Sequence, residues 1–218
     1  MAVDKHINFF QLHKASEKPG CPLCHIISDR AEWYIDNLLF EHVSDRGFRA
    51  LHRASGGFCA FHSRNLVAFR DGLAVAILSR DILEDRIASF ENHKLWRPKG
   101  KCPICVEQER IEEEYLSFLA ASGGDSDEEK ELREAFIASE GLCAPHYSSL
   151  LFTPKGRPRK APDWIQKFHE NKFQDLLHRI SLFIELSAYG RQKEFTALSK
   201  KDQLVWKEAA TVLRGTAE

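Results

Sequence analysis

The six cysteines of this chain all lie in two kinds of short motif, and each kind occurs twice. The first is C-P-x-C, written CPLC at residues 21–24 and CPIC at residues 102–105. The second is G-x-C-A-x-H, written GFCAFH at residues 57–62 and GLCAPH at residues 141–146. Thiolate sulfur and imidazole nitrogen are preferred ligands of Zn²⁺, and a two-residue gap lets one turn present both to a single ion. A single C-x-x-C is a weak signal, whereas two complete sets predict two metal sites.

The ligands are assigned in chain order, so that each copy of the motif pair supplies one site. Each set fills the four positions of a tetrahedron with protein side chains, and such closed sites are structural rather than catalytic. Two zinc ions are therefore the predicted cofactors. The proline after each first cysteine suits the first turn of a helix, because its fixed φ is already helical. The predicted ligand sets are Cys21, Cys24, Cys59 and His62 for the first site, and Cys102, Cys105, Cys143 and His146 for the second.

Other chemistry fits parts of the same motifs. Three thiolates and one imidazole can bind an iron–sulfur cluster, which we place second to zinc. Thioredoxin-like redox catalysis by C-P-x-C needs a βαβ context, which the sequence lacks. CPLCH matches the pattern of covalent haem attachment, yet the second copy reads CPICV, so His25 is interpreted as an ordinary helix residue. Zinc-bound thiolates are also nucleophilic, and the sequence does not separate a redox sensor from a structural site.

The motifs belong to an internal duplication. Aligning Cys24 with Cys105 places Tyr34 on Tyr115, each ten residues further along. The second and third cysteines are 35 residues apart in the first copy and 38 in the second. The extra length falls in ASGGDSDEEK, residues 121–130, which is typical of a loop. The sequence therefore predicts a repeated unit of roughly eighty to ninety residues, present in two copies.

Apolar residues recur at helical spacing almost throughout the chain, and no segment shows the alternation of a strand. The predicted fold is all-α, a helical bundle of two pseudo-repeats, each with a three-cysteine, one-histidine metal site. Long helices are expected over residues 73–90 and 163–189 and a last one over 200–213, where Ser199 is the expected N-cap. The residues expected on the buried face of the first of these are Val75, Leu78, Ile82, Ile87 and Phe90.

The expected domain division follows the duplication. Residues 1–97 form the first repeat, residues 98–190 the second, and residues 191–218 a helical extension, all packed as one compact unit. RPKGK, residues 97–101, is the expected joint between the copies, and TPKGRPRKAP, residues 153–162, an exposed loop within the second copy.

Several residues outside the motifs are candidates for contact with a ligand or partner. Tyr34 and Tyr115 are either a shared ligand contact or core aromatics with the hydroxyl at a boundary, and we favour the second interpretation. Basic residues of the 153–162 loop suit phosphate: Lys155, Arg157, Arg159 and Lys160. The first copy is rich in arginine, but DSDEEKE at residues 125–131 offsets these charges and the net charge is only −1. The histidines without ligand spacing are expected at the surface or its boundary: His6, His13, His42, His52, His93, His169 and His178.

The start of the chain lacks the apolar core of a signal peptide, and no run approaches the length of a membrane span. We therefore expect a cytoplasmic protein without membrane contact, in which reducing conditions disfavour disulfides. The sequence shows no glycine-rich phosphate loop and no nucleophile elbow in convincing context.

The twin C-P-x-C and C-x-x-H motifs resemble those of an uncharacterised family of bacterial and archaeal helical proteins, over residues 21 to about 189. The resemblance implies metal binding and a helical fold, and it implies no activity. The leading hypothesis is a zinc-binding, non-enzymatic interaction or regulatory module for a protein or nucleic-acid partner. The alternative is a redox-sensing or enzymatic protein that uses metal thiolates or a pocket between the repeats.

Overall fold

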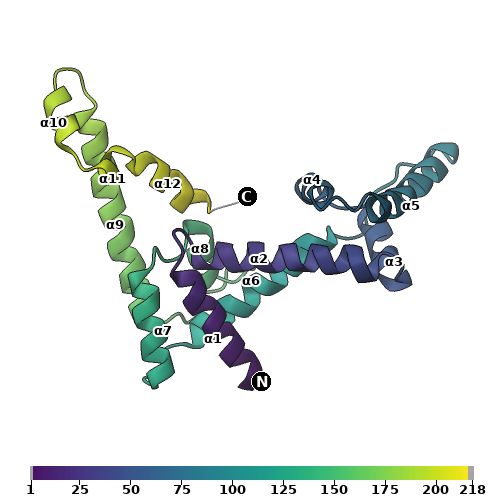
Figure 1. The fold of residues 1–218 in the computed structure, drawn as a ribbon, viewed down its shortest axis with the longest axis horizontal. Helices are drawn as coiled ribbons and strands as arrows, with labels where there is room; N and C mark the ends of the chain where they lie inside the picture. Colours follow the sequence, from purple (N-terminus) through teal and green to yellow (C-terminus); the bar gives the residue numbers. More distant parts are fainter. Residues whose placement is uncertain (1, 216–218) are drawn as a thin grey trace. The chain divides into compact units, whose positions relative to one another are not determined.

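The computed structural model describes residues 2–215, and all of its regular elements are helices (Figure 1). Within these residues there is no β-strand, only an isolated bridge between Phe152 and Pro158. The prediction of an all-α fold is therefore confirmed. In chain order the helices are α1 (Ala2–Ser16), α2 (Pro22–Asn37), the π-helix η1 (Leu38–His42), α3 (Arg46–Ser55), α4 (Ala60–Ala68), α5 (Gly72–Glu91), α6 (Pro103–Ala121), α7 (Asp127–Ala138), α8 (Ala144–Leu151), α9 (Asp163–Leu186), α10 (Gln192–Ala197), α11 (Lys200–Gln203) and α12 (Val205–Arg214).

The chain forms two compact units. The first unit combines the segment up to Ile26 with everything from Glu113 onward, and the second unit is the continuous segment Ile27–Glu112. Both boundaries fall inside long helices, because α2 begins in the first unit and α6 ends there. The division at residues 97 and 190 that the duplication suggests is a different one, and it stays a prediction about the repeats.

In the first unit, α1 packs on α7, while α9 packs on α10, α11 and α12, and α12 also contacts α8. Tyr115 and Phe136 are completely buried there. Helix α7 begins inside the segment expected to be a loop, because Ser126 and Glu129 form a capping box that satisfies the first amide groups of the helix. Ser199 caps α11 as expected, but a break at Leu204 divides the last predicted helix into α11 and α12.

In the second unit, α5 packs on α3, α4 and η1. The core contains Ile35, Leu38, Leu78 and Ile104. Asp81 is fully buried in this unit, and its carboxylate accepts hydrogen bonds from the Arg49 guanidinium at 2.5 and 2.7 Å. The Arg49 guanidinium thus offsets the cost of removing the Asp81 carboxylate from water.

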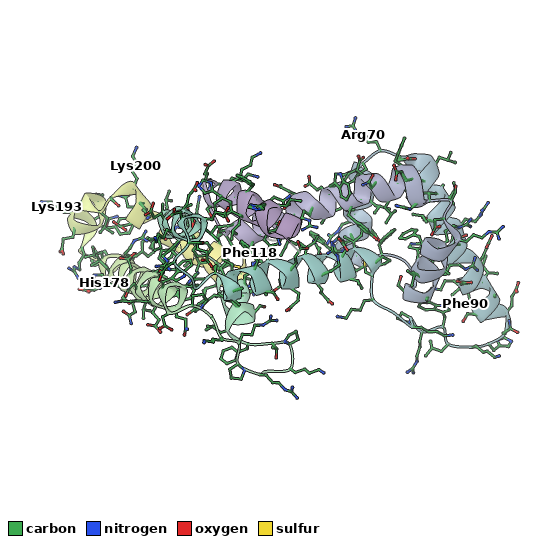
Figure 2. All side chains as sticks on the ribbon, turned by 90° about the horizontal axis from the view of Figure 1, so that it is seen from below. Arg70, Phe90, Phe118, His178, Lys193 and Lys200 are labelled. Atoms are coloured by element: carbon green, nitrogen blue, oxygen red, sulfur yellow. The ribbon has the colours of Figure 1, made fainter. Side chains whose placement is uncertain are left out.

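The expected buried face of α5 is wrong in its second half. Ile87 and Phe90 are 53% and 70% exposed, and Phe90 lies at the surface of the helix (Figure 2). Each residue turns a helix by about 100°, so Ile87 lies about 180° around α5 from the buried Leu78. Leu73 and Leu83 share this outer face and are 74% and 60% exposed. No helix of the described residues has both the length and the apolar character needed to cross a bilayer.

Candidate metal centres

The eight predicted ligands form two clusters that could each hold a metal ion. In each cluster the four ligand atoms lie within 4.8 Å of one another. Every member of cluster 1 belongs to the first unit, and every member of cluster 2 to the second. Cluster 1 consists of Cys21, Cys24, Cys143 and His146; cluster 2 consists of Cys59, His62, Cys102 and Cys105.

The ligand grouping in chain order is therefore wrong. Each cluster combines the C-P-x-C motif of one sequence copy with the C-x-x-H motif of the other. The 16-residue helix α2 advances the chain by about 24 Å, which carries it away from Cys21 and Cys24 before the second motif is reached. The second motif instead meets the third, Cys102 and Cys105, and the fourth motif returns to the first.

The two clusters have nearly the same dimensions. Within each C-x-x-H motif the cysteine Sγ and the histidine Nδ1 are 3.2 Å apart. From the same Nδ1 atoms to the two C-P-x-C sulfurs, the distances are 3.4 and 3.5 Å in cluster 1 and 3.5 and 3.4 Å in cluster 2. The second C-P-x-C sulfur lies 3.8 Å from the C-x-x-H sulfur in both. Both sets of ligand atoms thus outline a tetrahedron of one size.

Helix N-termini present all eight ligands. Cys59 and Cys143 are the N-cap residues of α4 and α8, while Cys21 and Cys102 immediately precede α2 and α6. The carbonyl of each of these four cysteines accepts a first-turn hydrogen bond of 2.9 to 3.3 Å. Two helix N-termini therefore meet at each cluster, and their positive dipole ends favour the thiolate form of cysteine.

The clusters differ in their exposure to solvent. Cys21, Cys24 and Cys143 are 4%, 8% and 3% exposed. In cluster 2 Cys102 is buried, but Cys59 and Cys105 are only half-buried. Cluster 2 is consequently the more accessible of the two to small reagents.

The end of α12 lies against cluster 1. A Cβ atom added at Gly215 would be 3.2 Å from the Sγ atoms of both Cys24 and Cys143. Gly215 has φ +78° and ψ 169°, a backbone conformation that residues with a Cβ rarely adopt. The glycine therefore permits both the turn and the close approach of the backbone to the two sulfurs.

The ligand groups influence one another's protonation. In cluster 1, the neighbouring Cys143 and Cys21 lower the pKa of Cys24, and burial raises the pKa of Cys21. Burial opposes the charged form of His146, but hydrogen bonding to the Cys143 and Cys24 sulfurs outweighs it and raises the His146 pKa to about 10. A metal ion requires thiolates and a neutral imidazole, so its binding would displace protons from this cluster.

Cluster 2 shows a similar division between its half-buried sulfurs. Burial opposes ionisation of Cys59, but hydrogen bonds from the His62 amide and the Cys105 thiol lower its pKa. Burial and the neighbouring thiolates raise the pKa of Cys105 to about 12. Cys59 is therefore the more readily ionised thiol of the two, and it carries the N-cap position of α4.

A buried histidine that the sequence analysis placed at the surface supports cluster 1. His169 is 0% exposed, its Nε2 accepts a hydrogen bond from the Leu142 amide at 2.9 Å, and its Nδ1 donates to the Ile165 carbonyl at 2.8 Å. The ring of Tyr147 stacks on it with a centroid separation of 4.3 Å. His169 thus contacts the residues on both sides of the C-x-x-H motif. Its i+4 spacing from Ile165 was the signal that could have identified it.

His52 is a second correction, because it is 2% exposed and lies between the rings of Phe48 and Phe58 in the second unit. Burial lowers the pKa of both His52 and His169, that of His169 to about 4.

The other candidate contacts do not converge on one site. Tyr115 is fully buried and donates a hydrogen bond to Gln11, and Tyr34 is a half-buried residue packed on the core of the second unit. Arg159 forms a bidentate ion pair with Glu113, with nitrogen–oxygen distances of 2.5 and 2.6 Å. Lys155, Arg157 and Lys160 are exposed in the 153–162 loop.

Comparison with known proteins gives one informative similarity. No protein-family model and no solved structure matches the chain. An uncharacterised 23.9 kDa protein from the xynA 3′ region of Caldicellulosiruptor sp. (strain Rt8B.4) is 25% identical over 174 residues, which are 78% of this chain and 83% of that protein. This similarity assigns no activity, since the relative is itself uncharacterised. The family resemblance is supported as far as two clusters of three cysteines and one histidine.

Proposed function

We propose that the chain binds one zinc ion in each cluster and that both ions are structural. A zinc–sulfur bond of about 2.3 Å and a zinc–nitrogen bond of about 2.05 Å give a tetrahedron with edges of about 3.8 Å between sulfurs and about 3.5 Å between sulfur and nitrogen. The observed distances are 3.8 Å between sulfurs and 3.2 to 3.5 Å between sulfur and nitrogen. This agreement, repeated in both clusters, is the observation that carries the proposal.

The same dimensions favour one ion over an iron–sulfur cluster. The protein ligands of an iron–sulfur cluster bind different iron atoms, so they lie further apart than the ligands around a single tetrahedral ion. Here all four ligand atoms lie within 4.8 Å in both sites. Protein side chains fill every position, which leaves no place for a substrate or a catalytic water.

Each ion would close a long segment of chain. Cys24 and Cys143 are 119 residues apart, and Cys59 and Cys105 are 46 apart. The chain-entropy relation for cross-links assigns about 5 and about 4 kcal/mol to loops of these lengths. Binding free energies of structural zinc are about 10–16 kcal/mol in small peptides, so each ion is expected to govern the folding of its unit. The use of all six cysteines as thiolate ligands suits a reducing, cytoplasmic location.

For the physiological role we propose a non-enzymatic interaction or regulatory module. The exposed apolar face of α5, formed by Leu73, Leu83, Ile87 and Phe90, supports this role. Scattered apolar residues at the surface are ordinary, but four on one face of one helix, with the exposed Arg80 between Leu73 and Leu83, suit contact with a partner.

Redox sensing is the second candidate, and the half-buried sulfurs of cluster 2 support it. The Sγ atoms of Cys59 and Cys105 are 3.8 Å apart and reachable from solvent. Hydrogen peroxide could take two electrons from these two thiolates and, with two protons from solvent, give a disulfide and two water molecules, with release of the metal.

Metal analysis of anaerobically purified protein tests the proposal. We expect about two zinc ions per chain, and six free thiols after denaturation with chelator. Iron with a visible absorbance band, or protein with no metal and with disulfides, would contradict it. Loss of zinc from cluster 2 alone after mild peroxide treatment would favour the redox role over a purely structural one.

A further inference from the structure

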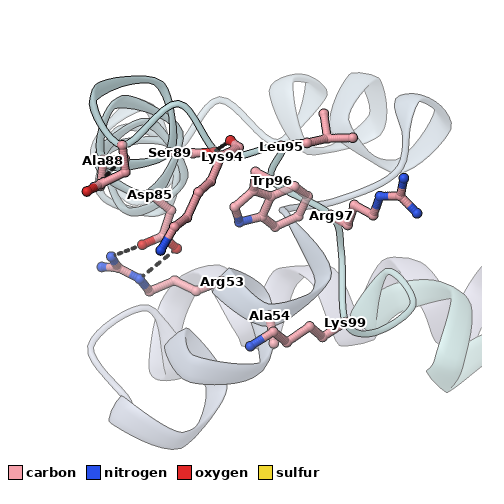
Figure 3. Close-up of a pocket in the computed structure, with 11 residues that line it drawn as sticks. Arg53, Ala54, Asp85, Ala88, Ser89, Lys94, Leu95, Trp96, Arg97 and Lys99 are labelled. Carbon is pink, nitrogen blue, oxygen red and sulfur yellow. Dashed lines mark hydrogen bonds and ion pairs between the residues drawn. The ribbon is translucent and has the colours of Figure 1, made fainter.

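The second unit contains a cleft of about 560 Å³, bordered by α3, α5 and the loop of residues 92–102 that joins α5 to α6 (Figure 3). Clefts of about 300–1,000 Å³ are the usual size of small-molecule sites. The charged residues that line it are four cations and one carboxylate, a formal balance of +3. They are Arg53, Lys94, Arg97 and Lys99 against Asp85.

The single carboxylate is already compensated. The Arg53 guanidinium donates hydrogen bonds to both oxygens of Asp85 (Figure 3). It also lies 3.3 Å from a Glu84 oxygen. Arg49 is likewise bound to Asp81. Two of the three arginines of α3, Arg49 and Arg53, are therefore paired with acids of α5.

The three loop cations are in a different situation. Lys94, Arg97 and Lys99 are exposed, and no carboxylate of the described residues forms an ion pair with any of them. Lys94 and Lys99 extend to one side of the Trp96 ring and Arg97 to the other (Figure 3). An anion beside Lys94 and Lys99 would therefore be attracted by both ammonium groups.

The cleft is held open by the fold before any ligand binds. The Lys94 amide donates to the Ser89 carbonyl at 2.9 Å, and the Lys99 amide donates to the Ala54 carbonyl at 2.7 Å. These two hydrogen bonds tie the loop to α5 and to α3. A ligand therefore needs to order little of the loop backbone, which lowers the entropic cost of binding.

An aromatic ring forms part of the wall. Trp96 lies in the chain between Lys94 and Lys99 and is half-buried. The Arg86 guanidinium lies 3.9 Å from the centroid of its ring. The ring packs so closely on Gly56, which has φ +74°, that a Cβ at Gly56 would come within 2.1 Å of it. Trp96 is thus a fixed apolar surface beside the loop cations (Figure 3).

We propose that this cleft binds a phosphate-bearing ligand of nucleotide size, with one phosphate on Lys94 and Lys99, a further phosphate or the ligand's ring edge toward Arg97, and the ring system against the part of Trp96 that Arg86 and Gly56 leave exposed. Lysine and arginine are the side chains that bind phosphate, and cations beside an aromatic ring are typical of nucleotide and single-strand binding. A free nucleotide and single-stranded RNA present the same chemistry here, and the experiment separates them.

The cleft also lies next to cluster 2. The hydrogen bond from Lys99 to Ala54 joins the segment that leads into Cys102 to the segment that leads into Cys59. A zinc ion bound in cluster 2 would tie the same two segments together. This dependence of the cleft on zinc rests on the proposed function, whereas the charges and walls of the cleft do not.

The test compares two variants of the full, metal-bound chain that lose the same three positive charges. Binding of a fluorescein-labelled ten-nucleotide RNA is followed by anisotropy, and binding of ATP by calorimetry, with zinc content measured on every sample. The cleft variant is Lys94→Ser, Arg97→Ser and Lys99→Ser; the control, in an exposed loop of the first unit, is Lys155→Ser, Arg157→Ser and Lys160→Ser.

We expect at least one probe to bind, with about tenfold weaker binding for the cleft variant and little change for the control. For RNA, three phosphate contacts predict binding about 20-fold weaker at about 200 mM salt than at about 50 mM, and the cleft variant should lose most of this dependence. Response to ATP alone identifies a free nucleotide, and response to RNA alone a single strand. Absence of binding by both probes, or equal weakening in both variants, would overturn the proposal. If either of these results is obtained while the zinc content of the wild type and of both variants is normal, the proposal for the cleft is overturned and the proposal for the metal sites is not.

Discussion

Replacing Gly215 with alanine should weaken cluster 1 specifically. The new Cβ would lie 3.2 Å from the Sγ atoms of Cys24 and Cys143, so α12 or the sulfurs would have to move by a few tenths of an ångström. The positive φ adds strain of about 1–3 kcal/mol for a residue with a side chain. Gly156 provides a control, because it has φ +72° but no atom within 4 Å of the corresponding Cβ position.

Urea unfolding and cobalt substitution together measure this effect. We expect Gly156→Ala to lose about 1 kcal/mol of unfolding free energy and Gly215→Ala about 2–3 kcal/mol, since only the second adds crowding at the sulfurs to the backbone strain. Gly215→Ala should alter only the part of the cobalt–thiolate absorbance that comes from cluster 1, about half of the total, because cluster 2 is unaffected. Equal destabilisation by the two variants, with unchanged cobalt spectra, would refute the placement of α12 on cluster 1.

Three further outcomes follow from the structure. A competing chelator should remove the metal of cluster 2 faster than that of cluster 1, because Cys59 and Cys105 are half-buried. Metal release should therefore show a fast and a slow phase, and Cys105→Ser should abolish the fast one. Release in a single phase from the wild type would count against this order. His169 is neutral when buried and its pKa is about 4, so its stabilisation is complete above the unfolded pKa of about 6.5 and is lost as the pH falls toward 4. Between about pH 7.5 and about pH 5 the wild type should lose about 2 kcal/mol more than His169→Gln, and nitrogen NMR should find the proton on Nδ1; a proton on Nε2 would contradict the assignment. Arg179→Met should cost about 2 kcal/mol, because it leaves Asp202 and Glu208 without their shared cation; an unchanged denaturation midpoint would show that this network is not stabilising.

The sequence predicted what depends on local spacing. Helical periodicity identified α5 and α9 closely, and the two-residue gaps identified all eight cluster members, because one turn of chain determines how such a pair is presented. Which pairs meet depends on where long helices carry the chain. The in-order assignment ignored the length of α2, and for that reason the pairing was wrong.

Burial was the other quantity that local pattern could not determine. The apolar residues of α5 surround much of the helix, and only the packing of α3 and α4 shows that Leu78 faces inward while Ile87 faces out. His169 looked like a surface histidine because its partners, the Leu142 amide and the Ile165 carbonyl, are backbone groups that leave no mark in residue types.

The crossed pairing of motifs is the central claim, and zinc content of two double variants tests it most directly. Cys21→Ser with Cys143→Ser removes two ligands from cluster 1, whereas Cys21→Ser with Cys59→Ser removes one ligand from each cluster. The structure predicts about one zinc ion per chain for the first variant and close to none for the second. The reverse result, close to none for the first and about one for the second, would contradict it and restore the pairing in chain order.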